Sequence, residues 1–145
     1  MEVRIAKHSD LQQLLELYTQ TGNSIPSFDA ELENLWQRIM ADENHHVVVG
    51  VVDGIIVSSC VLNVILNLTK NQCPYAIIEN VVTHEDYRNR GYASQVLDFA
   101  REIAKNERCY KITLTTGSKR ESTLRFYEKA GYNQDDKIAF IQWLG

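Results

Sequence analysis

The centre of the chain is built from strand-like segments, and this feature limits the possible folds more than any other. Residues 46–52, 55–65 and 75–83 are rich in β-branched side chains, which favour strands. Asp53-Gly54 separates the first two segments, and this dipeptide between strand-like segments is typical of a tight hairpin. A polar loop at 67–72 precedes the third segment. We therefore expect an antiparallel meander of about three strands.

Helical spacing of apolar residues lies on both sides of this meander. In the first third, Ser9 and Gln12 predict a capping box at the start of a helix that Gly22 ends. In chain order we expect a strand at 3–5, that helix, a helix from near Ser27, the meander, a helix at about 91–106, a strand at 110–115, a helix at 122–130 and a strand at 138–144. Strand, helix and strand in succession imply a parallel pair. The fold class is α/β (α+β), a mixed sheet covered by helices.

Length and charge limit the classes of protein that fit. The chain has 145 residues and a net charge of −4, which predicts one domain over 1–145 and argues against nucleic acid as the main partner. Cys60, Cys73 and Cys109 form no CxxC pair, and the four histidines lack metal-ligand spacing, so we expect reduced cysteines and no metal. No segment approaches the ~20 apolar residues of a membrane span. We expect a cytoplasmic protein with no membrane partner.

The segment from Arg88 to Ser94 is the most informative for function. It joins the strand that ends near Thr83 to the following helix, and a helix start has unpaired N–H groups and a positive dipole. Gly91 allows a ligand to approach the backbone, and two arginines add positive charge. These features are typical of a pyrophosphate cradle. The alternative is an ordinary polar loop with solvated arginines.

Two motifs of this chain resemble those of the GNAT superfamily of N-acetyltransferases. Arg88-Asn89-Arg90-Gly91-Tyr92-Ala93 fits the pattern Q/R-x-x-G-x-G/A. Phe126-Tyr127-Glu128-Lys129-Ala130-Gly131-Tyr132 fits an aromatic-Tyr pair followed by E-x-x-G-aromatic. One helix and one strand separate the motifs, as in the family. The resemblance covers essentially the whole chain and implies the GNAT fold, a mostly antiparallel sheet with splayed fourth and fifth strands and helices on both faces.

The resemblance also implies acetyl-CoA as cosubstrate and places its contacts. Main-chain N–H groups of 89–94 would hold the pyrophosphate, and the backbone of 81–83 would pair with the pantetheine arm as an added strand. An amide near Val81 would polarise the thioester carbonyl. Arg120 stands where many family members have asparagine, and it would meet a CoA phosphate or lie in a solvated helix start. The residues expected at the cofactor are Val81, Val82, Thr83, Arg88, Asn89, Arg90, Gly91, Tyr92, Ala93, Ser94 and Arg120.

Two residues are the candidates for proton transfer. Tyr127 matches the family tyrosine beside the CoA sulfur, where it would protonate the departing thiolate; its alternative role is a core aromatic beside Phe126. Glu79 is a carboxylate within an otherwise apolar strand, and it is the candidate base. Its alternatives are a structural ion pair or an exposed strand face. His84 is a weaker candidate in a turn, and Cys109 is interpreted as a packing residue.

The expected reaction is direct attack of a primary amine on acetyl-CoA in a ternary complex. The acceptor is open: polyamines, amino acids, aminoglycosides and protein N-termini all fit. The strand around Glu79 and the second motif show local similarity to glucosamine-6-phosphate N-acetyltransferases, although no basic pocket for a phosphosugar is evident from the sequence. The competing hypothesis is a non-catalytic acyl-CoA-binding sensor or partner module. A homodimer is left open, and an apolar surface around Trp36 or Trp143 would favour one.

Overall fold

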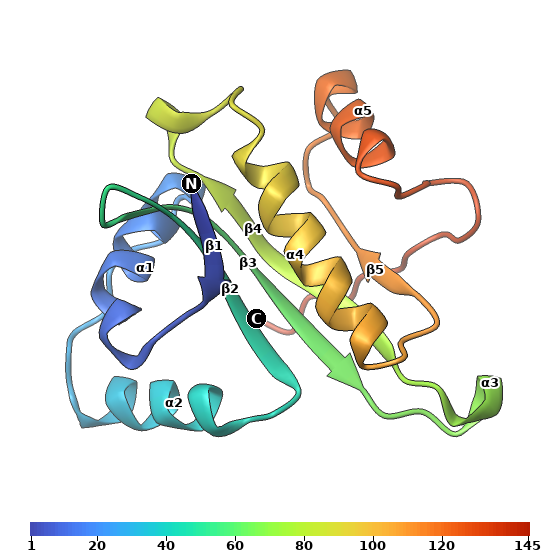
Figure 1. Ribbon diagram of the computed structural model, residues 1–145, viewed down its shortest axis with the longest axis horizontal. Helices are drawn as coiled ribbons and strands as arrows, with labels where there is room; N and C mark the ends of the chain where they lie inside the picture. Colours follow the sequence, from blue (N-terminus) through green and yellow to red (C-terminus); the bar gives the residue numbers. More distant parts are fainter. The chain divides into compact units, whose positions relative to one another are not determined.

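The computed structural model describes residues 1–145, which form two compact units, Met1–Leu114 and Thr115–Gly145 (Figure 1). The first unit contains all the strands and most of the helices. The second unit contains one helix, α5 (Glu121–Lys129). The prediction of a single domain over 1–145 stays a prediction.

A five-stranded sheet with the order β1-β2-β3-β4-β5 forms the centre of the first unit. Its strands are β1 (Glu2–Ile5), β2 (His45–Val52), β3 (Ile55–Ile65), β4 (Tyr75–Thr83) and β5 (Ile112–Leu114). All neighbours are antiparallel except β4 and β5, which are parallel. Asp53 and Gly54 have φ values of 49° and 78°, as a two-residue hairpin turn requires. The predicted meander and the mixed sheet are confirmed.

Helices cover both faces of this sheet. The longer ones are α1 (Leu11–Tyr18), α2 (Ala30–Ala41) and α4 (Tyr92–Asn106), and the short helical turns are η1 (His8–Asp10), η2 (Thr19–Thr21), α3 (Thr69–Gln72) and η3 (Glu85–Tyr87). Cys60 faces α4, because its Sγ lies 3.9 Å from the Val96 carbonyl oxygen. Its neighbour Val61 faces the other way and belongs to the core cluster under α1 and α2. Figure 1 shows α4 along one face of the strands, and the prediction of helices on both faces is confirmed.

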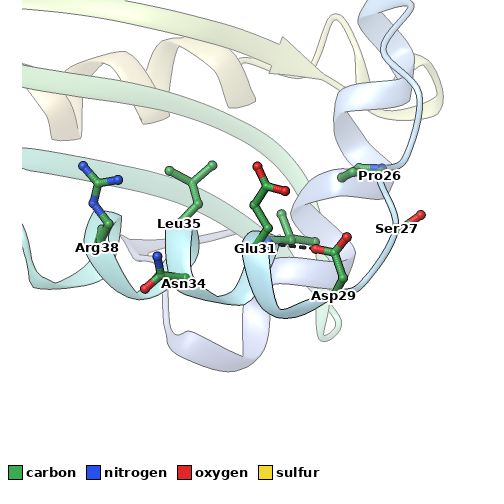
Figure 2. Close-up of a pocket in the computed structure, with 8 residues that line it drawn as sticks. Pro26, Ser27, Asp29, Glu31, Asn34, Leu35 and Arg38 are labelled. Carbon is green, nitrogen blue, oxygen red and sulfur yellow. Dashed lines mark hydrogen bonds between the residues drawn. The ribbon is translucent and has the colours of Figure 1, made fainter.

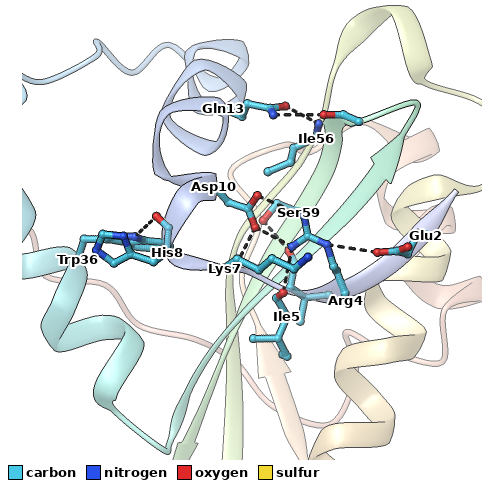
Figure 3. A network of polar contacts seen from close by, with 12 residues as sticks. Glu2, Arg4, Ile5, Lys7, His8, Asp10, Gln13, Trp36, Ile56 and Ser59 are labelled. Carbon is cyan, nitrogen blue, oxygen red and sulfur yellow. Dashed lines mark hydrogen bonds and ion pairs between the residues drawn. The ribbon is translucent and has the colours of Figure 1, made fainter.

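No side-chain hydrogen bond caps the start of α1, so the predicted Ser9–Gln12 box is wrong, and Asp10 instead closes the η1 turn that precedes the helix. The chain first forms η1, so the Asp10 carboxylate reaches back to accept from the Lys7 main-chain N–H at 2.7 Å. Arg4 binds both oxygens of the same carboxylate, at 2.6 and 3.2 Å, and its hydrogen bond lowers the pKa of Asp10. Figure 3 shows this network between β1 and α1.

The α2 helix begins at Ala30, three residues after the predicted start near Ser27. The Asp29 carboxylate accepts from the Leu32 N–H at 3.0 Å and caps the helix at Ala30. A hydrogen bond joins α2 to η1, since Trp36 Nε1 donates to the His8 carbonyl at 3.0 Å (Figure 3). Trp36 is buried, so it offers no apolar surface to a second copy.

The predicted final strand at 138–144 is not formed, and this prediction is wrong. A strand needs a neighbouring strand for its main-chain groups, and the second unit contains no strand. Apolar side chains of this segment are exposed, including Phe140 and Trp143 at 92% and 84%. The β-branched and aromatic residues of this segment therefore favour a strand conformation, but the segment has no neighbouring strand with which to pair. No helix in the chain is long and apolar enough to cross a membrane.

Candidate functional site

One extra residue in β4 bends the strand at Asn80. Val61 of β3 pairs with Glu79, and Ser59 pairs with Val82, so two residues of β4 lie opposite one residue of β3. This arrangement is a β-bulge. Asn80 has a φ of 54°, in the left-handed region that asparagine tolerates better than most residues. Because Ser59 and Val61 share a face, Glu79 and Val82 also share a face, on the side of α1.

The edge of β4 is open beyond Ile78. The parallel ladder with β5 contains only the pairs of Ala76, Ile77 and Ile78, so residues 79–83 have no strand beside them on that edge. The register also gives Val81 no partner on β3. The predicted separation of the fourth and fifth strands is therefore confirmed, and the edge can accept an extended ligand.

Main-chain donors gather where the loop of 88–94 enters α4. No acceptor within the protein binds the N–H groups of 89–94, since the first bond of the helix runs from the Gln95 N–H to the Gly91 carbonyl at 3.1 Å. No side chain caps this helix start. Asn89 and Gly91 have φ values of 62° and 78°, and a Cβ added to Gly91 would meet nothing within 4 Å. The free donors lie at the positive end of a 15-residue helix, where they can bind an anion.

The two arginines of this loop are fixed by contacts that leave their charges unpaired. Arg88 Nε donates to the Thr83 carbonyl at 3.2 Å, which joins the loop to the end of β4. The Arg90 guanidinium lies 5.4 Å from the centre of the Tyr87 ring. Neither forms an ion pair with a carboxylate. Both positive charges are available to a ligand, although both side chains are also exposed.

Glu79 lines a cavity of about 440 Å³ between α1, α2 and the sheet. Its carboxylate makes no hydrogen bond or ion pair with the protein, so the alternative of a structural ion pair is wrong; the side chain is exposed. Asn80 lines the same cavity, which places the bulge in its wall. Burial raises the pKa of Tyr18, another lining residue, to about 12, so its phenol stays protonated.

The two remaining candidates lie on α5 and at its N-cap. Tyr127 of α5 makes edge contacts with Phe126 and Tyr132, at ring-centre distances of 5.0 and 6.2 Å. Arg120 stands at the N-cap of the same helix and is exposed. Both belong to the second unit, and the predictions made for them stay predictions.

Two minor candidates have structural roles. His84 Nδ1 accepts from the Asp86 N–H at 3.1 Å and so caps the η3 turn. Burial raises the pKa of the Cys109 thiol, which disfavours the nucleophilic thiolate and agrees with a packing role. No group of three or more metal-binding side chains gathers in the structure.

A second hollow of about 660 Å³ lies along α2 and contains none of the predicted site residues. It is lined by Pro26, Ser27, Asp29, Glu31, Leu32, Asn34, Leu35 and Arg38. Figure 2 shows these side chains along α2 and the segment before it, with Asp29 turned toward the first turn of the helix. Leu32 and Leu35 line both this hollow and the cavity beside Glu79.

Sequence reasoning missed Asn80 and the walls that α1 and α2 give to the cavity. Asn80 interrupts a strand of β-branched residues, and an asparagine at such a place is a signal for left-handed backbone. The cavity walls have no comparable signal. Tyr18 and Trp36 follow ordinary helical spacing, which does not distinguish a cavity wall from a filled core.

The comparisons with known proteins agree with this geometry. The model of the Acetyltransferase (GNAT) family matches residues 9–132. Glucosamine 6-phosphate N-acetyltransferase of Trypanosoma brucei brucei is 30% identical over 138 residues, which cover 94% of this chain and 92% of that protein.

Solved structures give the same result. A protein from Agrobacterium tumefaciens that is named as an acetyltransferase superposes with a TM-score of 0.89 at 35% identity, over 99% of this chain and 100% of that one. Glucosamine-6-phosphate N-acetyltransferase from Arabidopsis thaliana shares the fold, with a TM-score of 0.88 at 22% identity, over 99% of this chain and 98% of that one. The chain therefore belongs to the GNAT family of acetyltransferases, enzymes that use acetyl-CoA.

Proposed function

We propose that this protein transfers an acetyl group from acetyl-CoA to a primary amine of a small molecule or peptide, by direct attack in a ternary complex. One observation carries the proposal: the main-chain donors of 89–94 are free and lie in the loop that Arg88 joins to the open edge of β4. Membership of the GNAT family supports the same reaction.

The residues present fit acetyl-CoA as a ligand. A diphosphate would accept hydrogen bonds from the N–H groups of 89–94, with Arg88 and Arg90 adding charge. The open edge at 81–83 would pair with the two amides of the pantetheine arm, as an added strand does. Arg120 would bind a phosphate of the same ligand. Ala93 is small, so the first turn of α4 leaves space for the diphosphate.

Each chemical role falls to a residue of this chain. Acetyl-CoA supplies an activated acyl group in its thioester. The Val81 N–H would donate to the carbonyl oxygen as negative charge develops there. Glu79 would take the proton that the amine must lose, directly or through water. Tyr127 would donate its phenolic proton to the sulfur as the C–S bond breaks and the C–N bond forms.

The test is release of CoA thiol from acetyl-CoA by the purified protein, over a panel of primary amines that covers all the open acceptor classes. We expect amine-dependent release and an acetylated product of matching mass. Binding of acetyl-CoA without amine-dependent release over the whole panel would favour the competing hypothesis, a non-catalytic acyl-CoA-binding module.

A second acceptor hypothesis, glucosamine 6-phosphate, is favoured by the 30% identity to an enzyme named for that substrate. It requires groups that bind a phosphate. The same panel tests it, because glucosamine and glucosamine 6-phosphate differ only in that group. A rate that rises with the phosphate would support it.

Three further predictions belong to this proposal. A single domain over 1–145 is supported by the family match, which spans both units. A cytoplasmic location is supported by three free cysteines. A homodimer is supported by exposed apolar side chains such as Phe140 and Trp143, and sedimentation of the purified protein would test it.

A further inference from the structure

The helix walls of the cavity beside Glu79 are mainly apolar. Its helix walls come from Leu11, Leu14, Leu15 and Tyr18 of α1 and from Leu32, Leu35, Trp36 and Ile39 of α2, and Val47 and Val61 of the sheet complete the apolar lining. The indole N–H of Trp36 is already bonded to the His8 carbonyl. Trp36 therefore presents only apolar ring surface to an occupant. The volume of about 440 Å³ suits a small molecule.

Apart from the Tyr18 phenol of α1, the polar side chains of the cavity lie on the strands. They are His45, Asn63, Glu79 and Asn80. No lysine or arginine lines the cavity, and burial lowers the pKa of His45, which favours its neutral form at neutral pH. The only formal charge in the lining is the Glu79 carboxylate. A phosphate or carboxylate placed there would lack a cationic partner and would face a negative charge.

The same lining complements an amine on an apolar body. Glu79 attracts an ammonium group, and it lies beside the bulge at Asn80, next to the open edge of β4 where acetyl-CoA would bind. The apolar walls would take the rest of the molecule out of water. We infer that the natural acceptor is a primary amine on an apolar, uncharged body, an arylalkylamine or alkylamine, and not a phosphosugar. This inference rests on the proposed acetyl transfer.

A homologous series tests the inference quantitatively. The straight-chain amines from propylamine to octylamine have nearly the same basicity, so they differ only in apolar surface. Each methylene that enters an apolar site contributes about a fourfold gain in affinity. We expect kcat/KM for thiol release, at saturating acetyl-CoA, to rise about threefold to fourfold per methylene until the cavity is filled. The value of kcat/KM for 2-phenylethylamine should exceed that for glucosamine 6-phosphate by about 100-fold or more.

A variant with a matched control locates the effect in the cavity. Leu35 lines the cavity and is 49% exposed, so Leu35→Lys places a cation in the wall with little risk to folding. We expect kcat/KM for hexylamine to fall about tenfold while KM for acetyl-CoA stays unchanged. Leu66→Lys changes an exposed leucine outside the cavity and should leave both values unchanged.

The possible outcomes separate the inference from the proposal on which it rests. Rates that are independent of chain length, or glucosamine 6-phosphate as a better acceptor than every alkylamine and arylalkylamine, would overturn the apolar acceptor and keep acetyl transfer. An equal loss in Leu35→Lys and Leu66→Lys would also overturn the cavity assignment. Absence of release with every amine would overturn the proposed function itself.

Discussion

Replacing Gly91 by alanine separates the cost of a backbone conformation from the loss of a ligand contact. Gly91 has φ 78° and ψ 10°, and a residue with a Cβ adopts this left-handed region at a cost of about 1–2 kcal/mol. In the free protein the added methyl would meet nothing within 4 Å. With acetyl-CoA bound, the methyl would occupy space that the diphosphate needs in order to reach the amides of α4.

Two measurements follow from these magnitudes. The conformational cost should lower the free energy of unfolding by about 1–2 kcal/mol and the melting temperature by about 2–4 °C per kcal/mol in a chain of this size. Hydrogen bonds to a charged group contribute about 1.5–3 kcal/mol each, so loss of one of them weakens acetyl-CoA binding by about 10-fold to 100-fold. Calorimetric titration well below the melting temperature measures the second effect alone.

Gly22 provides the matched control. It has φ 83° and ψ 8°, nearly the conformation of Gly91, and a Cβ there would also meet nothing within 4 Å. Gly22→Ala should therefore show the same loss of stability with unchanged affinity for acetyl-CoA. Equal affinities of the two variants, or wild-type affinity of Gly91→Ala, would refute the assignment of the loop as the diphosphate site.

Three further substitutions test other parts of the structure. Tyr127→Phe should lower kcat about tenfold or more with acetyl-CoA affinity nearly intact; an unchanged kcat would remove its role as acid. Glu79→Gln should abolish the limb on the acid side of the pH–rate profile, where protonation disables a base; an unaltered profile would exclude Glu79 as the base. Asp10→Asn should lower the free energy of unfolding by about 2–3 kcal/mol at pH 7. Because Arg4 lowers the pKa of Asp10, this difference is complete above the unfolded-state value of about 3.9 and disappears as the pH falls through the lower folded-state value. Urea unfolding at several pH values measures this difference. Glu2→Gln, which changes a side chain that is 70% exposed, should change the free energy of unfolding little, and equal losses in both variants would contradict this account.

Local sequence patterns predicted those parts of the fold that neighbouring residues determine. The strands around Asp53-Gly54 need only β-branched side chains and a turn that accepts positive φ, and both are visible in the sequence. The same holds for the start of α4, where Gly91 marks both a helix boundary and a place free of side-chain caps. These features required no knowledge of distant residues.

Other parts depend on partners that a local pattern does not contain. The segment 138–144 has the composition of a strand, but its backbone has no strand to bond in its unit. Before α1, the Ser9–Gln12 capping box does not form. The Asp10 carboxylate binds the Lys7 N–H at the start of the η1 turn instead, and Arg4 from β1 holds it there. Two helices and three strands, which meet only after folding, line the cavity beside Glu79, so residue spacing in the sequence does not predict its apolar lining.

The bulge at Asn80 connects the cofactor edge to the acceptor cavity. In a regular strand, Glu79 and Val81 would share a face and Val82 would lie on the opposite one. The extra residue instead puts Glu79 and Val82 together on the α1 side and removes Val81 from the β3 register. A carboxylate in the cavity and an unpaired strand segment beside the β4 edge thus come from one backbone irregularity. The conformation of Asn80 therefore affects both substrates of the proposed reaction, although its side chain needs no chemical role.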